Sequence, residues 1–183
     1  MFNWHDIWEK KGRIHTRDLT ILDGFENNSD VNPKKIALEI INQLNINKED
    51  KVLEVGCGAG MIAQFLKCDY VGIDYSKGLV EKHIEILNNS VLHCHANDLP
   101  FKDKIFDKCF AYSIFQYFNN KKYARKVISE MKRVSKKMIF IGDLPTKSHD
   151  KEHLLFKKNE FSNYSISDGF YNSDRFNIWS SFD

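Results

Sequence analysis

Hydrophobic residues follow two alternating patterns along most of the chain. Five short runs predict buried strands, because they are rich in apolar, β-branched and aromatic residues and are bounded by polar or turn residues. These runs are residues 51–55, 70–73, 91–95, 106–112 and 138–141. Stretches with apolar residues every three or four positions predict helices after Pro33, across 61–66, after Ser76 and across 124–134. Strands that alternate with helices predict a parallel sheet with covering helices.

The two ends of the chain have a different character. Residues 146–183 are polar and aromatic, and segments 161–166 and 175–182 are expected to pair as a hairpin. The segment Trp4–Trp8, followed by Gly12 and Arg13, is aromatic and basic, and two compatible interpretations stay open for it. It forms a lid that places Trp4, Trp8 and His15 near a bound ligand, or a helix that docks Trp4 and Trp8 onto the domain.

A glycine-rich loop follows the first predicted strand. The segment 52–60 reads VLEVGCGAG, a hydrophobic strand that runs into Gly56, Gly58 and Gly60. Glycine allows tight turns and lets a ligand approach the backbone closely. The free N–H groups of a following helix would then point at the ligand, at the strand ends where open α/β sheets bind their ligands.

An acidic residue at the end of the second predicted strand strengthens this interpretation. Asp74 lies 18 residues after Gly56 and can accept hydrogen bonds from two ribose hydroxyls. The nicotinamide fingerprint requires a small residue at position 61, where this chain has Met61. No GKS or GKT follows, which excludes a Walker loop. The pattern favours a nucleoside ligand without pyrophosphate.

With these motifs the chain resembles the class I, Rossmann-like methyltransferases that use S-adenosylmethionine (SAM). LEVGCGAG is similar to the first motif of that family, VGIDYS to the second and CHANDLPFKDKIFD to the adenine-contacting segment. The resemblance implies a doubly wound, mostly parallel α/β sheet of seven strands in the order 3-2-1-4-5-7-6. Strand 7 would be antiparallel and helices would cover both faces. One domain is expected over 1–183, with a cap segment 1–32, a SAM-binding core 33–145 and a hairpin region 146–183.

The resemblance also assigns roles to residues. The implied cofactor contacts are Glu54, Gly56, Cys57, Gly58, Gly60, Asp74, Tyr75, Ser76, Asn97, Asp98, Leu99 and Ser113. Gly60 would allow close packing of the following helix, and Asp98 would accept from the adenine amino group. Trp8, Gln116 and Tyr117 are the candidates for holding the methyl acceptor. The histidine that many small members carry after the fourth strand is absent, so the catalytic base is unknown.

Composition and charge narrow the function further. The net charge of +2 gives no reason to expect a nucleic-acid or membrane partner, and four dispersed cysteines indicate no zinc site or disulfide framework. His93 and His95 lack nearby ligands at metal-site spacing, so no metal is expected. Eight basic residues in 121–137 are typical of a solvated helix face and less so of an RNA-binding surface. The expected location is the cytoplasm.

Together these features predict a SAM-dependent methyltransferase whose acceptor is a small molecule, such as a sugar or another biosynthetic intermediate. Its product from the cofactor would be S-adenosylhomocysteine (SAH). Three alternatives stay open: a SAM-binding partner subunit without activity, an RNA-directed methyltransferase, and a nicotinamide-dependent oxidoreductase, which Met61 disfavours. A second subunit could complete the acceptor site in a homodimer.

Overall fold

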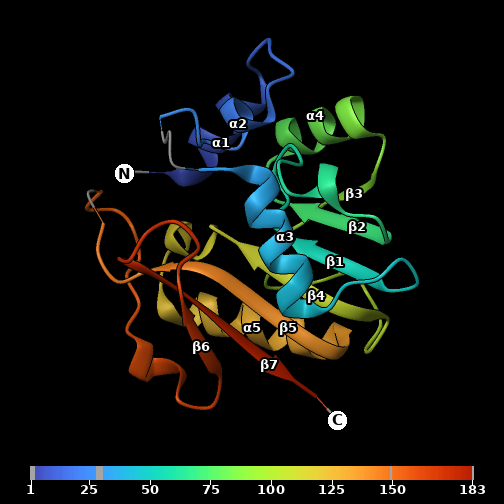
Figure 1. Cartoon of the computed structure of the whole chain (residues 1–183). Coiled ribbons are helices and arrows are strands. Elements are labelled where there is room, and N and C mark those ends of the chain that lie inside the picture. The colour runs from blue at the N-terminus through green and yellow to red at the C-terminus, as the bar shows by residue number, and fades with distance from the viewer. Residues whose placement is uncertain (1–2, 28–30, 149, 183) are drawn as a thin grey trace.

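A seven-stranded sheet in the order β3-β2-β1-β4-β5-β7-β6 runs through the molecule (Figure 1). The computed structural model describes residues 3–27, 31–148 and 150–182. The strands are β1 Lys51–Val55, β2 Asp69–Asp74, β3 Ser90–His93, β4 Phe106–Tyr112, β5 Ser135–Pro145, β6 Ser165–Asp168 and β7 Arg175–Ser181. Strands β1 to β5 are parallel neighbours, and β7 runs antiparallel to both β5 and β6. The predicted order and antiparallel strand are confirmed.

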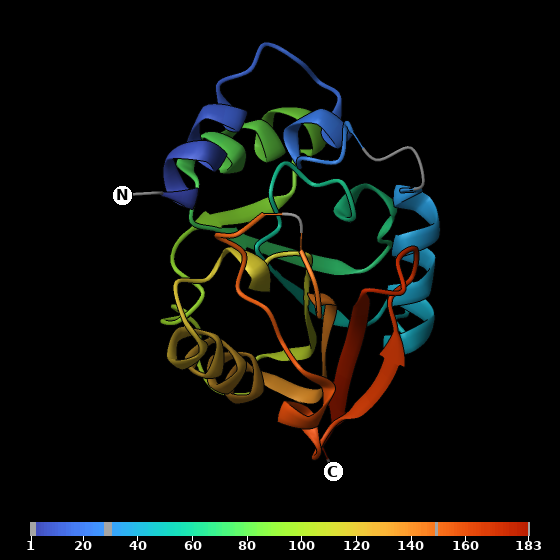
Figure 2. The ribbon, with the colours of Figure 1, turned by 90° about the vertical axis from the view of Figure 1, so that its left-hand side faces the viewer.

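Helices cover both faces of this sheet, as the sequence predicted. They are α1 Trp4–Gly12, α2 Leu19–Leu22, α3 Pro33–Leu44, α4 Lys77–Leu87 and α5 Lys121–Val134, with 3-10 turns η1 Ala63–Phe65, η2 Phe115–Tyr117 and η3 Lys158–Phe161. Figure 2 shows α3 and α5 on opposite sides of the sheet. Side-chain polar groups begin the longer helices: Asn32 caps α3 with Pro33 in the first turn, Ser76 caps α4 and Asn120 caps α5.

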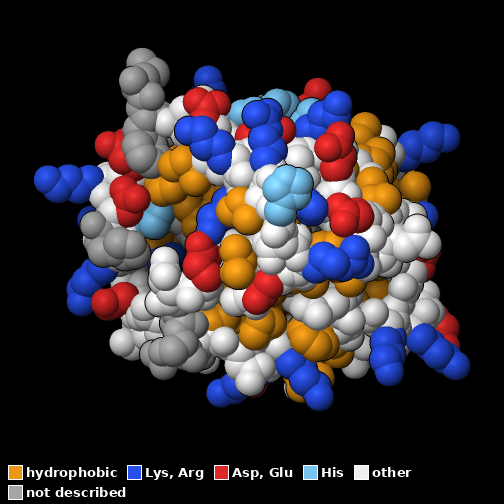
Figure 3. Space-filling model, turned by 90° about the horizontal axis from the view of Figure 1, so that it is seen from above, with side chains coloured by type: hydrophobic (Ala, Val, Ile, Leu, Met, Phe, Trp, Pro, Cys, Tyr) orange, Lys and Arg blue, Asp and Glu red, His pale blue; other side chains and the backbone are white. Residues whose placement is uncertain are grey.

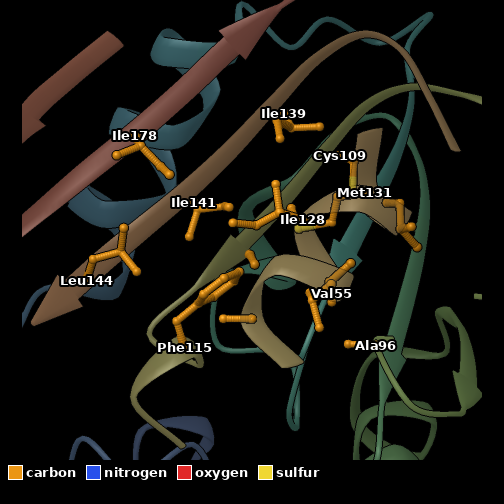
Figure 4. Packing of buried hydrophobic residues seen from close by; sticks show 14 of the residues in the cluster. Val55, Ala96, Cys109, Phe115, Ile128, Met131, Ile139, Ile141, Leu144 and Ile178 are labelled. Carbon is orange, nitrogen blue, oxygen red and sulfur yellow. The ribbon is translucent and has the colours of Figure 1, made fainter. Parts of the chain in front are cut away.

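Alternating residues of the central strands supply two hydrophobic cores. Leu53 and Val55 of β1 join the core beneath α5, whereas Val52 joins the core beneath α3. Figure 4 shows the α5 core, in which Ile128 and Met131 pack against the strands. Because successive side chains point to opposite faces and both faces are covered, the central strands are hydrophobic almost throughout.

The helix that the sequence predicted across residues 61–66 is wrong: only the 3-10 turn η1 forms there. Because β2 is parallel to β1, the chain between them has to run back along the whole length of β1, which at about 3.3 Å per residue is roughly 16 Å. A helix would need about eleven residues for that distance, and only residues 61–68 lie between the glycine loop and β2. The chain therefore returns by an irregular path.

Three smaller differences from the sequence-based boundaries concern strands. β3 ends at His93, so residues 94 and 95 leave the sheet. β5 is longer than predicted and has an irregular register between Ile141 and Leu144. The first arm of the hairpin begins at Ser165, because residues 158–161 form η3. No helix within the described ranges is long and apolar enough to cross a membrane.

A buried ion pair lies at the amino ends of the central parallel strands. Lys108 of β4 contacts Asp50 just before β1, and the two side chains are 7% and 2% exposed. Replacing Lys108 by Ala would leave the buried Asp50 carboxylate with only the more exposed Lys137 ammonium, 3.6 Å away. We expect this to lower the free energy of unfolding by about 3–5 kcal/mol in urea titrations.

Lys136→Ala is the matched control for that measurement. Lys136 pairs with Asp107 at the same end of the sheet, but its side chain is 47% exposed. An exposed pair contributes at most about 1 kcal/mol. Equal effects of the two substitutions would contradict the assignment of the buried pair as the stabilising one.

Candidate functional site

A cavity of about 330 Å³ lies at the carboxyl ends of β1, β2 and β4. The N-terminal segment closes it from above with Trp4, Trp8 and Phe25. Its wall combines aromatic rings with three carboxylates, those of Asp23, Glu54 and Asp74, and no Lys or Arg lines it among the described residues. The position is the one that the sheet topology favours for a ligand.

The glycine loop after β1 forms the floor of this cavity. Gly56 and Gly58 have φ angles of 74° and 51°. A Cβ on Gly56 would lie 2.6 Å from the Ile114 side chain, and one on Gly58 would lie 2.2 Å from Oδ1 of Asp23. Glycine is therefore required at both positions by backbone conformation and by space.

Protein groups already accept the hydrogen bonds of the loop. The N–H groups of Gly56 and Cys57 donate to the Ile73 carbonyl at 2.8 and 3.0 Å. Asp74 accepts from Gly58 at 3.0 Å and from Ser76 at 2.8 Å. Only the 3-10 turn η1 follows the loop in place of the expected helix, and the N–H groups of the loop are satisfied by the Ile73 carbonyl and the Asp74 carboxylate.

Asp23 takes the last donors of the loop and was not identified from the sequence. It follows α2, and its two oxygens accept from the N–H groups of Ala59 at 2.6 Å and Met61 at 2.8 Å. A single acid in a polar stretch gives no local signal of such a role. Only the fold brings it next to residues that are 36 and 38 positions away.

His83 of α4 supports the loop from below. Its Nδ1 lies 3.1 Å from the Gly58 carbonyl, and its Nε2 lies 3.1 Å from the Asn89 amide nitrogen. These partners require a neutral ring that donates from Nδ1 and accepts at Nε2. A Cβ on Gly60 would meet His83 and Leu87, so Gly60 packs against α4 and not against a following helix as predicted.

The three carboxylates repel one another inside the protein. Burial raises the pKa of Glu54 well above its usual value, and the neighbouring Asp23 and Asp74 raise it further, while a hydrogen bond from Tyr70 opposes this. Burial raises the pKa of Asp23 to about 7, against the hydrogen bonds of Ala59 and Met61. Burial also raises the pKa of Asp74. A cation in the cavity would relieve this repulsion.

The N-terminal segment is docked on α4. Gly12 of α1 touches the backbone of Gly78, where a Cβ on Gly12 would lie 2.3 Å from the Gly78 carbonyl carbon. Glu9 accepts from the Ser76 hydroxyl at 2.9 Å and from the Gly78 N–H at 3.3 Å. Trp4 and Trp8 meanwhile line the cavity. The lid and the docked helix that the sequence suggested are therefore one element, but His15, which was expected near the ligand, does not line the cavity.

A second group of polar side chains lies at the carboxyl ends of β4 and β5. Asp143 is 2% exposed and has a φ of 65°, which is unusual for a residue with a side chain. Its Oδ2 accepts from the Tyr171 hydroxyl at 3.2 Å and lies 3.7 Å from Arg175. Burial raises the pKa of Asp143, while Arg175 and the nearby Ser113 hydroxyl lower it.

Three buried polar atoms of this group have no hydrogen-bond partner among the described residues: Tyr112 Oη, Gln116 Oε1 and Asp143 Oδ1. Ser113 connects the group to the cavity, since it lines the cavity and its hydroxyl oxygen accepts from Gln116 Nε2 at 3.0 Å. Unpartnered buried polar atoms are costly unless a ligand or water completes them. Asp143 lies near the carboxyl end of β5 as Asp74 ends β2, and an acid at such a place is the signal that could have identified it.

The cavity brings together most of the residues singled out in the sequence. Those that line it are Trp8, Glu54, Gly56, Cys57, Gly58, Asp74, Tyr75, Ser113 and Tyr117. Those that do not line it are Gly60, Ser76, Asn97, Asp98, Leu99 and Gln116. Asp98 is exposed, and Leu99 is buried in the α5 core with its N–H donating to Glu130 at 2.9 Å. Residues 94–96 form the wall where segment 97–99 was expected, because β3 ends early.

The surface above the cavity has no dominant charge. Figure 3 shows acidic and basic side chains interspersed over the face that carries α1, α2 and α4. Part of the basic charge of 121–137 is paired: Lys121 with Glu160, and Arg133 with Glu130 and Asp103. The described residues hold no group of three or more potential metal ligands, and all four cysteines are free.

Comparison with known proteins identifies the domain. Residues 53–138 match the family described as methyltransferase domain, and this stretch contains the loop, Asp74 and Ser113. This part of the chain has the fold of the class I SAM-dependent methyltransferases. YrhH of Bacillus subtilis, which is named as a methyltransferase, is 25% identical over 144 residues, which are 73% of this chain and 80% of YrhH.

Solved structures share the fold of this methyltransferase domain at low sequence identity. Magnesium protoporphyrin IX methyltransferase from Synechocystis PCC 6803 with bound SAM has a TM-score of 0.68 and 14% identity, covering 97% of this chain and 90% of that one. Phosphoethanolamine N-methyltransferase 1 of Haemonchus contortus, in complex with phosphoethanolamine and SAH, has a TM-score of 0.74 and 12% identity. This match covers 96% of this chain and 47% of that one.

Protonation of His83 is expected to destabilise the methyltransferase domain. Burial lowers the pKa of His83 from 6.5 to about 4, so the folded state holds the ring neutral. The stabilising contribution is complete above pH 6.5 and is lost as the pH falls from 6.5 toward 4, by up to about 3 kcal/mol. Urea unfolding at pH 7 and pH 4.5 measures it.

His83→Asn should flatten that pH dependence, whereas His15→Asn, at an exposed position, should leave it unchanged. If the His83 variant and the wild type lost the same stability between pH 7 and pH 4.5, the neutral buried ring would not be the source of the pH dependence.

Proposed function

We propose that the chain binds SAM in this cavity and transfers the methyl group to a small molecule that carries a hydroxyl or amino group. The observation that carries the proposal is the convergence of three carboxylates in an aromatic-lined cavity without a lining Lys or Arg among the described residues. SAM carries a sulfonium and an ammonium group, and such cations are attracted both to carboxylates and to aromatic faces. A nicotinamide dinucleotide, with its pyrophosphate, would meet repulsion there.

Individual residues are assigned by their place in the cavity. Asp74 would hold the ribose hydroxyls, because each of its oxygens accepts one backbone N–H and keeps a further lone pair. Glu54 would face the ammonium group. Residues 94–96 and Tyr75 would flank the adenine. SAM supplies an electrophilic methyl group on sulfur, so the main task of the protein is to orient the acceptor in line with it.

The group of polar side chains behind Ser113 supports a methyl acceptor whose reacting group donates hydrogen bonds. Among the described residues, Gln116 Oε1 and Asp143 Oδ1 are acceptors without a hydrogen-bond partner, and Tyr112 can donate or accept. Gln116 and Asp143 do not line the cavity, so a hydroxyl or amino group bound there would be linked to them through Ser113, which does. Its proton would pass to the Ser113 oxygen while the Ser113 proton passes to Asp143. A carboxylate with a raised pKa is suited to this role, since the pKa moves toward the operating pH.

Cofactor binding is the first test of this proposal. Isothermal titration should detect binding of SAM and SAH but not of NADH. Asp74→Asn keeps the volume of the side chain and should weaken SAM binding by about 1–3 kcal/mol through lost ribose contacts. Asp69→Asn, at an exposed position of the same strand, is the control. Absence of SAM binding to the wild type would overturn the proposal.

Acceptor use is the second test. A panel of amino sugars, polyols and small amines should include compounds whose methylation releases SAH. Asp143→Asn should lower kcat for such an acceptor by at least about tenfold and leave SAM affinity unchanged. Asp174→Asn is the control, since that carboxylate pairs with Lys147 at the surface.

An unchanged kcat in the Asp143 variant would remove Asp143 from the proton route. SAM binding without transfer to any member of the panel would favour the alternative of a SAM-binding subunit that lacks activity.

A further inference from the structure

Asp23 occupies an unusual place for a residue of a lid. It lies in the N-terminal segment, outside the matched family region 53–138, yet it reaches the glycine loop and lines the cavity. Its two oxygens bridge the N–H groups of Ala59 and Met61. Asp23 is half-buried, and one side of it faces the cavity.

Among the described residues, no Lys or Arg lines the cavity next to Asp23. Asp74 raises the pKa of Asp23, and Asp23 in turn raises those of Glu54 and Cys57. The ammonium of Lys11, on the neighbouring helix, contacts the Ile21 carbonyl and Glu26. Backbone N–H groups of the glycine loop hold the carboxylate, which also lines the ligand space. That arrangement is suited to a positively charged group of the ligand.

We propose that Asp23 is part of the cofactor site, that its carboxylate contacts the positively charged end of SAM, and that SAM binding drives its proton into solvent. This inference rests on the proposed function, since it names a further ligand contact of the same cavity. The step balances: neutral Asp23 and cationic SAM give an ion pair within the site and one proton taken up by the buffer.

The direction of the pH dependence follows from the protonation of Asp23. Burial raises its pKa to about 7, so it is mainly protonated at pH 6. SAM that binds the ionised form must displace that proton, and its affinity therefore rises with pH until the group is ionised without ligand. Between pH 6 and pH 7 the affinity should increase about fivefold. His5 and His95 also line the cavity, so an Asp23 variant is needed to assign the effect to Asp23.

Calorimetry on the wild-type protein tests this without any substitution. SAM is titrated at pH 6 and pH 7 in two buffers of different ionisation enthalpy, which gives the number of protons released. About 0.9 proton should be released at pH 6 and about 0.5 at pH 7. Adenosine, which lacks both cationic groups, should release almost none. SAM binding without proton release would overturn the role of Asp23 and leave the proposed function standing.

Two variants assign the proton to its residue. Asp23→Asn should abolish most of the release at pH 6, and it should flatten the pH dependence of SAM affinity. Glu26→Gln is the matched control: it lies three residues along the same segment, it pairs with Lys11, and it does not line the cavity. The control should keep the wild-type release. Retention of the release by a folded Asp23→Asn protein would assign the proton to another group and overturn the proposal.

Discussion

The need to satisfy the backbone N–H groups of the glycine loop is the constraint on which the site depends. A loop that turns through Gly56, Gly58 and Gly60 presents several backbone donors in succession, and leaving buried donors unsatisfied is costly. The protein satisfies them with a strand carbonyl and two carboxylates, Asp74 and Asp23. Hydrogen-bond satisfaction therefore brings negative charge into the wall of the cavity.

In this arrangement the satisfaction of hydrogen bonds and the electrostatic energy oppose each other. The carboxylates that complete the loop repel each other and Glu54, so the geometry that satisfies the backbone is electrostatically unfavourable without a ligand. A ligand that carries positive charge removes that conflict. The N-terminal segment takes part in both demands, because it contributes Asp23 to the loop and Trp4 and Trp8 to the cavity wall. The lid and the glycine loop are consequently a single structural unit.

The sequence predicted those features that depend on neighbouring residues. The bounds of β1 and β4 agree with the structure, because burial on both faces gives continuous hydrophobic runs. Periodicity predicted a helix at 61–66 because it does not measure the length of chain available before β2. Asp23 and Asp143 were missed since their roles depend on distant contacts, the first with Ala59 and Met61 and the second with β7 and Ser113.

The order of the last two strands has a consequence for the growing chain. β6 precedes β7 in sequence, yet its partner in the sheet is β7, which lies between β6 and β5. Ribosomal synthesis therefore delivers β6 before the strand to which it pairs. Until Arg175–Ser181 has emerged, β6 and the open edge of β5 present unpaired backbone groups, the kind of exposed edge that favours misassembly. The nascent domain is most vulnerable to aggregation in that interval.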